Sequence, residues 1–275
     1  PRADGTARRL GAPAGRGYVP GVSLTLVTWN LKGSAGPDLA VVSDHLRAVG
    51  ADVVALQECQ RHQARRLGAL LGARSVGWGF KHWPVRTRPE GMAILGVSVP
   101  VAVRTTALSF RWQPWSWRRR IYQVGQVPAT ADDGAALLLN VHFSTERERE
   151  RRAHELATVV RVMEAMGAPT ILAGDANDRP GSDLFASLAA AGLRDAWLEV
   201  HPGSVEPDGA TNWRGWTRGT TKPPTQRIDL IAVSDVIAVV AATVPRFGEE
   251  GFEAFPAVSD HLPLTATLGV GRPPA

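Results

Sequence analysis

The chain consists of short apolar runs separated by polar stretches. Residues 22–29, VSLTLVTW, place apolar side chains on both faces of an extended chain, which predicts a strand covered on both sides. Residues 146–166 combine an apolar stripe of valines and methionines with the charged run ERERERR, which predicts a helix with one solvated face. Further helices are predicted at residues 37–50, 60–71 and 182–191, and further strands at residues 52–56, 75–80, 92–97, 101–108, 121–127, 136–143, 169–173, 193–197, 228–233, 236–243 and 263–268.

Strand-rich stretches with few helices between them predict a layered architecture. We expect a four-layer α/β sandwich, in which two packed, mixed and mostly antiparallel β-sheets are flanked by helices. A chain of 275 residues can bury the core of one such domain, and no interior linker divides it. Residues 22–270 are therefore expected to form a single domain, preceded by a flexible segment at residues 1–21.

The net charge of +5 is concentrated in two stretches of the chain. Residues 1–21 contribute +3 and residues 104–120 contribute +5, so the remainder carries −3. A local basic patch is what a nucleic acid partner would bind. Coding bias explains it equally well, because all but three of the 31 Lys and Arg residues are arginine in an Ala- and Gly-rich chain.

Hydropathy and cysteine content exclude several classes of protein. No apolar run approaches the roughly 18 residues of a membrane span, so no transmembrane segment is expected. The single cysteine, Cys59, excludes an internal disulfide and a thiolate zinc cluster. Nothing points to a stable protein partner, and a monomer is expected. The cytoplasm is the preferred compartment if only a methionine preceded Pro1, whereas a leader trimmed before Pro1 would indicate secretion.

Polar side chains stand where several predicted strands end or begin. Each one alone has a simple explanation, because Asn, Asp and Ser commonly open turns. Together they supply oxygen ligands of the kind that Mg²⁺ prefers, and histidines that exchange protons near neutral pH. These residues are Asn30, Glu58, His142, Asp175, Asn177, Asp229, Asp260 and His261.

Six short motifs carry these residues: TWN at 28–30, LQE at 56–58, NVHF at 140–143, GDAN at 174–177, RIDLI at 227–231 and SDHLP at 259–263. In this order they resemble the motifs of the endonuclease/exonuclease/phosphatase superfamily, which includes deoxyribonucleases, abasic-site endonucleases, sphingomyelinases and inositol-polyphosphate phosphatases. GDAN or SDH alone would carry little weight, but six motifs in order span nearly the whole folded chain. The resemblance implies the sandwich fold, and it implies that residues 22–270 are a catalytic domain that hydrolyses a phosphoester.

The resemblance also implies a divalent cation, Mg²⁺ with Mn²⁺ as an alternative. Glu58 would be its principal ligand, with Asn30 and Asp260 near the same ion. One position departs from the family, because the abasic-endonuclease branch often has an acid where this chain has Lys32. A lysine cannot ligate the cation, but it could contact a phosphate. The departure argues against a close relationship with that branch.

The remaining motif residues would carry the chemistry. By resemblance, His142 would hydrogen-bond a phosphate oxygen, and Asn177 would hold the phosphate or the attacking water. Asp229 would orient His261, which approaches the scissile phosphate. Asp175 would activate the water, although in a competing account of the same family His261 is the base.

Two segments rich in tryptophan and arginine are candidates for substrate contacts, FRWQPWSWRRR at 110–120 and TNWRGWTRGTTKPPTQ at 211–226. In the first segment, the rings could stack on bases and the arginines could pair with phosphates. The same side chains could instead meet a lipid headgroup, or pack at the edge of the sandwich. The second segment is expected to flank the active site, because loops carry specificity in this family. The candidate substrate-binding residues are Lys32, Arg118, Trp213, Arg214, Trp216 and Arg218.

Three functions are compatible with these observations. The preferred one is a phosphodiesterase or nuclease that acts on DNA or RNA by in-line attack of an activated water. The alternative is a phosphatase or phosphodiesterase acting on a small-molecule or lipid-linked phosphoester. An inactive binding scaffold is less favoured, because every site residue expected from the family is present.

Overall fold

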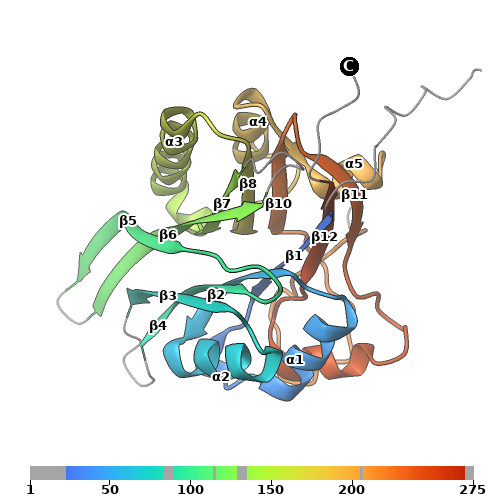
Figure 1. Ribbon diagram of the computed structural model, residues 1–275. Coiled ribbons are helices and arrows are strands. Elements are labelled where there is room, and N and C mark those ends of the chain that lie inside the picture. Colours follow the sequence, from blue (N-terminus) through green and yellow to red (C-terminus); the bar gives the residue numbers. More distant parts are fainter. Residues whose placement is uncertain (1–22, 83–88, 114–115, 129–134, 205–206, 270–275) are drawn as a thin grey trace, which may run out of the picture.

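The computed structural model describes residues 23–82, 89–113, 116–128, 135–204 and 207–269, and the side chains of residues 110–118 lie outside that description. The predicted flexible segment, residues 1–21, is also outside it. Within the described ranges the chain forms two six-stranded sheets packed face to face, with helices on both outer surfaces (Figure 1). The predicted four-layer α/β sandwich is therefore confirmed.

The first sheet has the strand order β11-β12-β1-β2-β4-β3. Its β1 and β2 run parallel, and its other neighbours run antiparallel. The strands are β1 (Ser23–Asn30), β2 (Val53–Gln60), β3 (Ser75–His82), β4 (Glu90–Gly96), β11 (Ala238–Thr243) and β12 (Leu264–Gly269).

The second sheet has the order β5-β6-β7-β8-β10-β9, with one parallel pair, β7 and β8. A single residue pair, His82 with Arg118, joins β3 to β6 and makes the two sheets formally continuous in the described chain. The strands are β5 (Val103–Gln113), β6 (Ser116–Pro128), β7 (Ala135–His142), β8 (Thr170–Asp175), β9 (Leu193–Asp195) and β10 (Asp229–Ser234).

The helices cover opposite faces of the sandwich. Helices α1 (Leu39–Ala48) and α2 (Arg61–Leu71) lie on the first sheet, and α3 (Arg149–Met166) and α4 (Asp183–Ala190) lie on the second (Figure 1). Short helices punctuate the connections: α5 (Ala196–Val200), α6 (Phe255–Val258) and the 3₁₀ turns η1 (Gly33–Ala35), η2 (Glu146–Glu148) and η3 (Phe252–Ala254).

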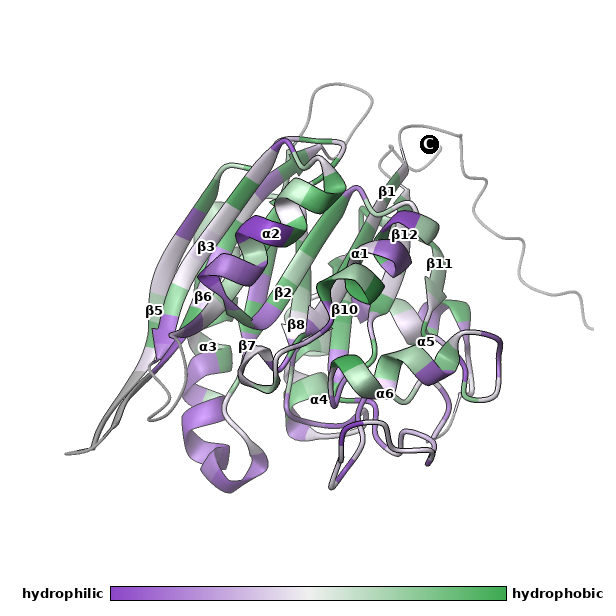
Figure 2. Cartoon of the chain, turned by 90° about the horizontal axis from the view of Figure 1, so that it is seen from below, coloured by the Kyte–Doolittle hydropathy of each residue, from purple (hydrophilic) through white to green (hydrophobic). Residues whose placement is uncertain are grey.

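Two apolar clusters hold the layers together, and the strand period of two residues assigns side chains to them. In β7, Leu138 belongs to the larger cluster, which includes residues of both sheets, whereas Leu139 and Val141 belong to a second cluster under α3 and α4. Leu156 and Leu184 are the helical partners in that second cluster. Figure 2 shows the result, with apolar colour along the strands and polar colour on much of α3.

One predicted strand is wrong in its second half. Residues 193–197 were expected to be extended, but β9 ends at Asp195 and α5 begins at the next residue. The Asp195 carboxylate accepts hydrogen bonds from the backbone N–H groups of Trp197 and Leu198. This side chain therefore caps a helix and ends the strand.

Candidate active site

Strand pairing brings the polar strand ends to one edge of the sandwich. In the second sheet, Asp175 at the end of β8 pairs in register with His142 of β7 on one side and with Asp229 of β10 on the other. Asn30 ends β1 of the first sheet, and its side-chain Nδ2 donates to Asp175 Oδ2 at 3.0 Å. Asp175 thus lies at the centre of the predicted catalytic residues.

The Asp175 carboxylate is buried and held from two sides. Besides Asn30, the backbone N–H of Asn177 donates to Asp175 Oδ1 at 2.8 Å. Burial raises the pKa of Asp175 to about 6, because a buried carboxylate loses hydration. The preceding Gly174 has φ 144°, and a Cβ there would lie 2.0 Å from the Val141 carbonyl oxygen, so only glycine lets β8 approach β7 this closely.

His261 stands between two buried acids. Its Nδ1 lies 2.7 Å from Asp229 Oδ2, and its Nε2 lies 3.9 Å from Asp175 Oδ2. Burial by itself lowers the pKa of His261, but the negative charges of Asp229 and Asp175 outweigh it and raise that pKa to about 10. The imidazole is therefore a cation at neutral pH.

Glu58 projects into the site from a strained position in β2. Its φ is 47°, in the left-handed region that a residue with a Cβ rarely adopts, and the β2–β4 register shifts at this point. Burial would raise the pKa of Glu58, but the positive charges of Lys81 and Arg120 outweigh burial and hold it below its usual value. The carboxylate is therefore ionised, and about a quarter of it is exposed, at 27%.

Lys81 belongs to the same cluster, although sequence reasoning did not select it. It lies near the end of β3, is buried, and places Nζ 3.0 Å from His142 Nδ1 and 3.6 Å from Glu58 Oε1. Burial and the charge of Arg120 lower the pKa of Lys81 to about 8. Burial, followed by the charge of Lys81, lowers the pKa of His142 well below its usual value, so His142 is neutral. The signal that could have found Lys81 is the one used for the other residues, a polar side chain at a strand end.

Lys32 contacts both Asp260 and Trp216. Its Nζ lies 2.5 Å from Asp260 Oδ2 and 4.7 Å from the centroid of the Trp216 ring. Trp216 is itself fixed, because its Nε1–H donates to the Pro256 carbonyl at 3.0 Å. Lys32 is in the left-handed region, and its backbone N–H donates to Asn30 Oδ1. Lys32, the residue at which the sequence departs from the abasic-endonuclease branch, thus forms an ion pair with Asp260, a predicted metal ligand.

The other substrate-binding candidates are placed differently. Trp213 is buried in the core beside Phe252, and its Nε1–H donates to the Lys222 carbonyl. Arg214 is exposed. Arg218 donates to the Ala35 and Gly36 carbonyls and so fastens its loop to η1. Arg118 is in β6, and its side chain lies outside the described part of the chain.

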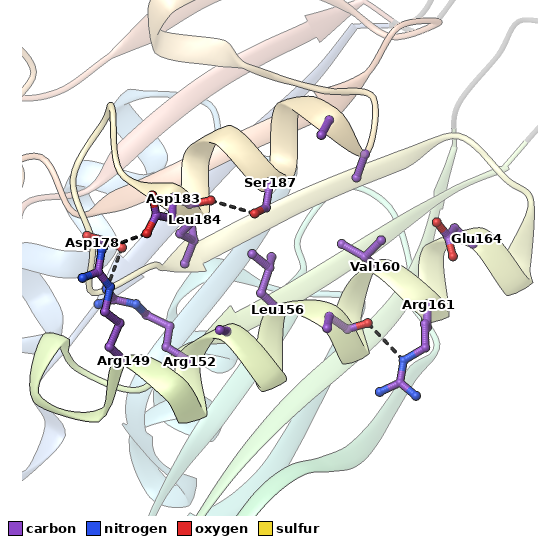
Figure 3. Close-up of a pocket in the computed structure, with 14 residues that line it drawn as sticks. Arg149, Arg152, Leu156, Val160, Arg161, Glu164, Asp178, Asp183, Leu184 and Ser187 are labelled. Carbon is purple, nitrogen blue, oxygen red and sulfur yellow. Dashed lines mark hydrogen bonds and ion pairs between the residues drawn. The ribbon is translucent and has the colours of Figure 1, made fainter.

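The loop after β8 is supported from α3. Asn177 has φ 50°, its side-chain Nδ2 donates to the Phe143 carbonyl at 2.9 Å, and its own carbonyl accepts from Arg152 at 2.5 Å. Arg152 also pairs with Asp178 at 2.6 Å. Figure 3 shows this pair at one end of a cavity of about 560 Å³ between α3 and α4, near Arg149. Among the described residues that line the cavity, Asp178 belongs to the loop after β8, and Arg152 of α3 is its partner.

The donor chemistry at this edge fits a hard divalent cation. Glu58 is an ionised carboxylate, and its neighbours Lys81 Nζ and His142 Nε2 lie 3.6 and 3.9 Å away, beyond hydrogen-bond distance. Mg²⁺ needs only one or two such carboxylates because it keeps several waters. Ligand atoms of Asp175, Asp229 and His261 also lie within 4.8 Å of one another. A short hydrogen bond joins two of these three residues and His261 is charged, so the trio fits proton handling better than cation binding.

A four-layer sandwich with this convergent set of acids, amides and histidines defines a phosphoester hydrolase. The model of the Endonuclease/Exonuclease/phosphatase family matches residues 27–261, and the chain belongs to this family. The resemblance seen in the six motifs is thereby confirmed, as is the hydrolysis of phosphoesters at the level of the family.

Solved structures of the same fold resemble the chain closely in shape and weakly in sequence. An endonuclease/exonuclease/phosphatase from Beutenbergia cavernae DSM 12333 has 23% identity and a TM-score of 0.70, over 92% of this chain and 73% of that one. A mannosyl-6-phosphatase from Bacteroides thetaiotaomicron has 20% identity and a TM-score of 0.66, over 89% and 99%. The human Nocturnin catalytic domain with bound sulfate has 18% identity and a TM-score of 0.67, over 92% and 97%.

No curated protein matched the chain in a sequence comparison. Among the described helices, none is both long enough and apolar enough to cross a bilayer.

Proposed function

We propose that the chain is a phosphoester hydrolase dependent on a divalent cation, in which Asp175 is the general base and His261 binds the phosphate as a cation. The observation that carries this assignment is the position of His261 between Asp229 and Asp175. An imidazolium with a pKa of about 10 has no free lone pair with which to take a proton from water. Asp175, with a pKa near 6, is ionised above that pH and can take it.

The other residues surround the position that the phosphate would occupy. His261 Nε2 and His142 Nε2 lie 3.9 and 3.6 Å from Asp175 Oδ2, so both could donate to non-bridging oxygens of a phosphate bound beside that carboxylate. Glu58 would hold Mg²⁺ or Mn²⁺, and the bound cation would supply positive charge against the phosphate. Asn177, fixed through its Nδ2 on Phe143, keeps its side-chain oxygen for the attacking water.

Asn30 and Asp260, the other two predicted ligands, contribute less directly. Asn30 Nδ2 is bonded to Asp175, and Asp260 Oδ2 is paired with Lys32. Asn30 would therefore orient the base and bind the cation through its Oδ1, while Asp260 would bind the cation through its remaining oxygen or through water. This division leaves Glu58 as the principal ligand.

A nucleic acid phosphodiester is the first candidate substrate. The hairpin of β5 and β6 extends beyond the neighbouring strands and carries five arginines within residues 104–120 (Figure 1). Two of them lie in its described part near the site: Arg119 donates to the Phe80 carbonyl, and the charge of Arg120 acts on Glu58 and Lys81. An arginine-bearing arm beside a phosphate site suits a polyanion that continues past the scissile bond.

A small phosphomonoester is the second candidate, and a different observation favours it. Lys81 is a buried cation within the site, and Lys32 is a second cation at its rim. A terminal phosphate carries more negative charge than a diester and uses more cations of this kind. The mannosyl-6-phosphatase among the structural neighbours has the same fold.

Hydrolysis assays with Mg²⁺ distinguish these substrates. The purified protein is incubated with plasmid DNA, with a 5′-labelled single-stranded oligonucleotide, and with sugar phosphates. The variants Asp175→Asn and His261→Ala serve as inactive controls. Asp183→Asn makes the same Asp-to-Asn change at an exposed position of α4 and should retain activity. Cleavage of DNA abolished by both site variants supports the nuclease. Sugar phosphate hydrolysis with intact DNA supports the second candidate, and hydrolysis of none of these substrates contradicts the proposal in favour of a binding scaffold.

A further inference from the structure

The contact between Lys81 and His142 determines how His142 can serve the reaction. Lys81 comes from β3 of the first sheet and His142 from β7 of the second, and both side chains are buried, at 2% and 4% exposure. Their contact joins Lys81 Nζ to His142 Nδ1 at 3.0 Å, which is hydrogen-bond distance.

An ammonium group has three N–H donors and no acceptor. His142 Nδ1 must therefore accept this hydrogen bond, which requires Nδ1 to carry no proton. A neutral imidazole has one N–H, so its proton must be on Nε2. If both ring nitrogens were protonated, the Nδ1–H of His142 would face the N–H groups of the Lys81 ammonium at 3.0 Å. Two donors would then meet without an acceptor, which is unfavourable.

The Nε2 side of the ring faces the centre of the site. Asp175 Oδ2 lies 3.6 Å from His142 Nε2 and Glu58 Oε1 lies 3.9 Å from it, both beyond hydrogen-bond distance. The Nε2–H thus points between two acids without a close bond to either. A phosphate oxygen in that position would receive it.

We propose that Lys81 is a positioning residue that holds His142 as a neutral imidazole with its proton on Nε2, ready to donate to the phosphate. The donation to phosphate rests on the proposed function, whereas the tautomer does not. The other charged groups near this pair are Glu58 and Asp175 on the Nε2 side and Glu90 near Lys81, with Arg120, His82 and His261 adding positive charge.

Nitrogen NMR of the histidine ring tests the tautomer in the protein without substrate. The chain is labelled with ¹⁵N-histidine, and the His142 signals are assigned by their loss in His142→Gln. At neutral pH we expect Nδ1 to have the shift of a bare nitrogen and Nε2 that of a protonated one. A proton on Nδ1 in the wild-type protein would overturn the proposal, whichever variants fold.

Substitutions at Lys81 then separate positioning from packing. Lys81→Arg keeps a donor-only side chain and should leave the proton on Nε2. Lys81→Glu supplies an acceptor and should bring a proton to Nδ1. Lys222→Glu, in an exposed loop, is the matched charge control and should change nothing. An unchanged His142 spectrum in a folded Lys81→Glu would also contradict the proposal.

Kinetics complete the test with the substrate found in the hydrolysis assays. Lys81→Gln should lower kcat by about 10- to 100-fold, as losses of orienting partners commonly do, while KM changes less. Lys81→Arg should retain most of kcat. If the NMR spectra show the expected proton on Nε2 but the protein hydrolyses no substrate, the proposed function is refuted and the assignment of the His142 tautomer still holds. Equal kcat in Lys81→Gln and wild type would refute the role of Lys81 in the reaction.

Discussion

Asp229 Oδ2 and His261 Nδ1 lie 2.7 Å apart, in a hydrogen bond closed to solvent between β10 and the segment before β12. The second carboxylate oxygen, Asp229 Oδ1, is buried and has no hydrogen-bond partner in the described structure. The charge of Asp229 acts on this imidazole and also raises the pKa of Asp175. Its chief effect is to keep His261 positively charged beside Asp175.

Removing the charge of Asp229 without changing the shape of its side chain should show how much the positive charge of His261 contributes to turnover. Asp229→Asn keeps the shape of the side chain but removes one of the charges that raise the pKa of His261, so that pKa should fall, while Asp175 and Asp260 still act to raise it. A smaller fraction of His261 is then protonated at neutral pH, and kcat should fall by about 100-fold or more. Steady-state kinetics and NMR titration of His261 measure both effects. Asp235→Asn, exposed in the turn after β10, is the control, and wild-type kcat in Asp229→Asn would contradict the assignment.

The ion pair of Lys32 with Asp260 should weaken cation binding. Lys32 Nζ lies 2.5 Å from Asp260 Oδ2, so a divalent cation at that carboxylate competes with a fixed ammonium group. Lys32→Met should raise the affinity for Mg²⁺ and Mn²⁺ several-fold, measured by isothermal titration calorimetry. Lys222→Met is the matched control. An unchanged affinity would mean that Asp260 is not near the cation.

Arg152, which holds the loop after β8, should contribute far more to the free energy of unfolding than the exposed pair of Arg149 and Asp183. Arg152 is buried and bonds both Asp178 and the Asn177 carbonyl, so Arg152→Met should cost about 3 kcal/mol and lower kcat as the loop loosens. Arg149 pairs with Asp183 at the exposed mouth of the same cavity, and Arg149→Ala should cost less than about 1 kcal/mol (Figure 3). Urea unfolding of both variants compares them directly. Equal losses would contradict the predicted role of burial.

Acid should destabilise the fold through His45. This ring contacts Trp29 and Phe255, and burial lowers its pKa from 6.5 to about 4. The unfolded chain thus takes up a proton that the folded chain refuses, so stability is full above pH 6.5 and is lost as pH falls toward 4, by at most about 3 kcal/mol. His45→Leu should flatten this part of the pH profile of urea unfolding. His154→Gln, exposed on α3, should leave it unchanged, and a parallel profile in His45→Leu would refute the assignment.

Much of the site could be predicted because it lies at the ends of strands. Asn30, Glu58 and Asp175 each follow an apolar run, and hydrophobic pattern is the most legible feature of a sequence. Lys81 was not predicted as a site residue because its strand was expected to end at Phe80, one residue before it. A lysine just outside an apolar run is usually exposed, and its burial here depends on His142, 61 residues away.

Contacts between distant segments account for what could not be predicted. Trp213 was a candidate for substrate contacts because of its segment, and its packing against Phe252 and its hydrogen bond to the Lys222 carbonyl are contacts within the core. Lys32 was expected near a phosphate, and its pairing with Asp260 spans 228 residues. Local pattern contains no information about such partners.

In the described strands, a single backbone pair, His82 with Arg118, joins the two sheets, so side-chain contacts of the active site also connect them. Three side-chain contacts bridge the sheets at the catalytic edge: Asn30 with Asp175, Lys81 with His142, and His261 with Asp229. If one sheet slid over the other by the width of an atom, all three would fail together. The catalytic residues thus add polar contacts between the sheets to the apolar packing of the larger cluster, so any shift of one sheet against the other would disturb the site directly.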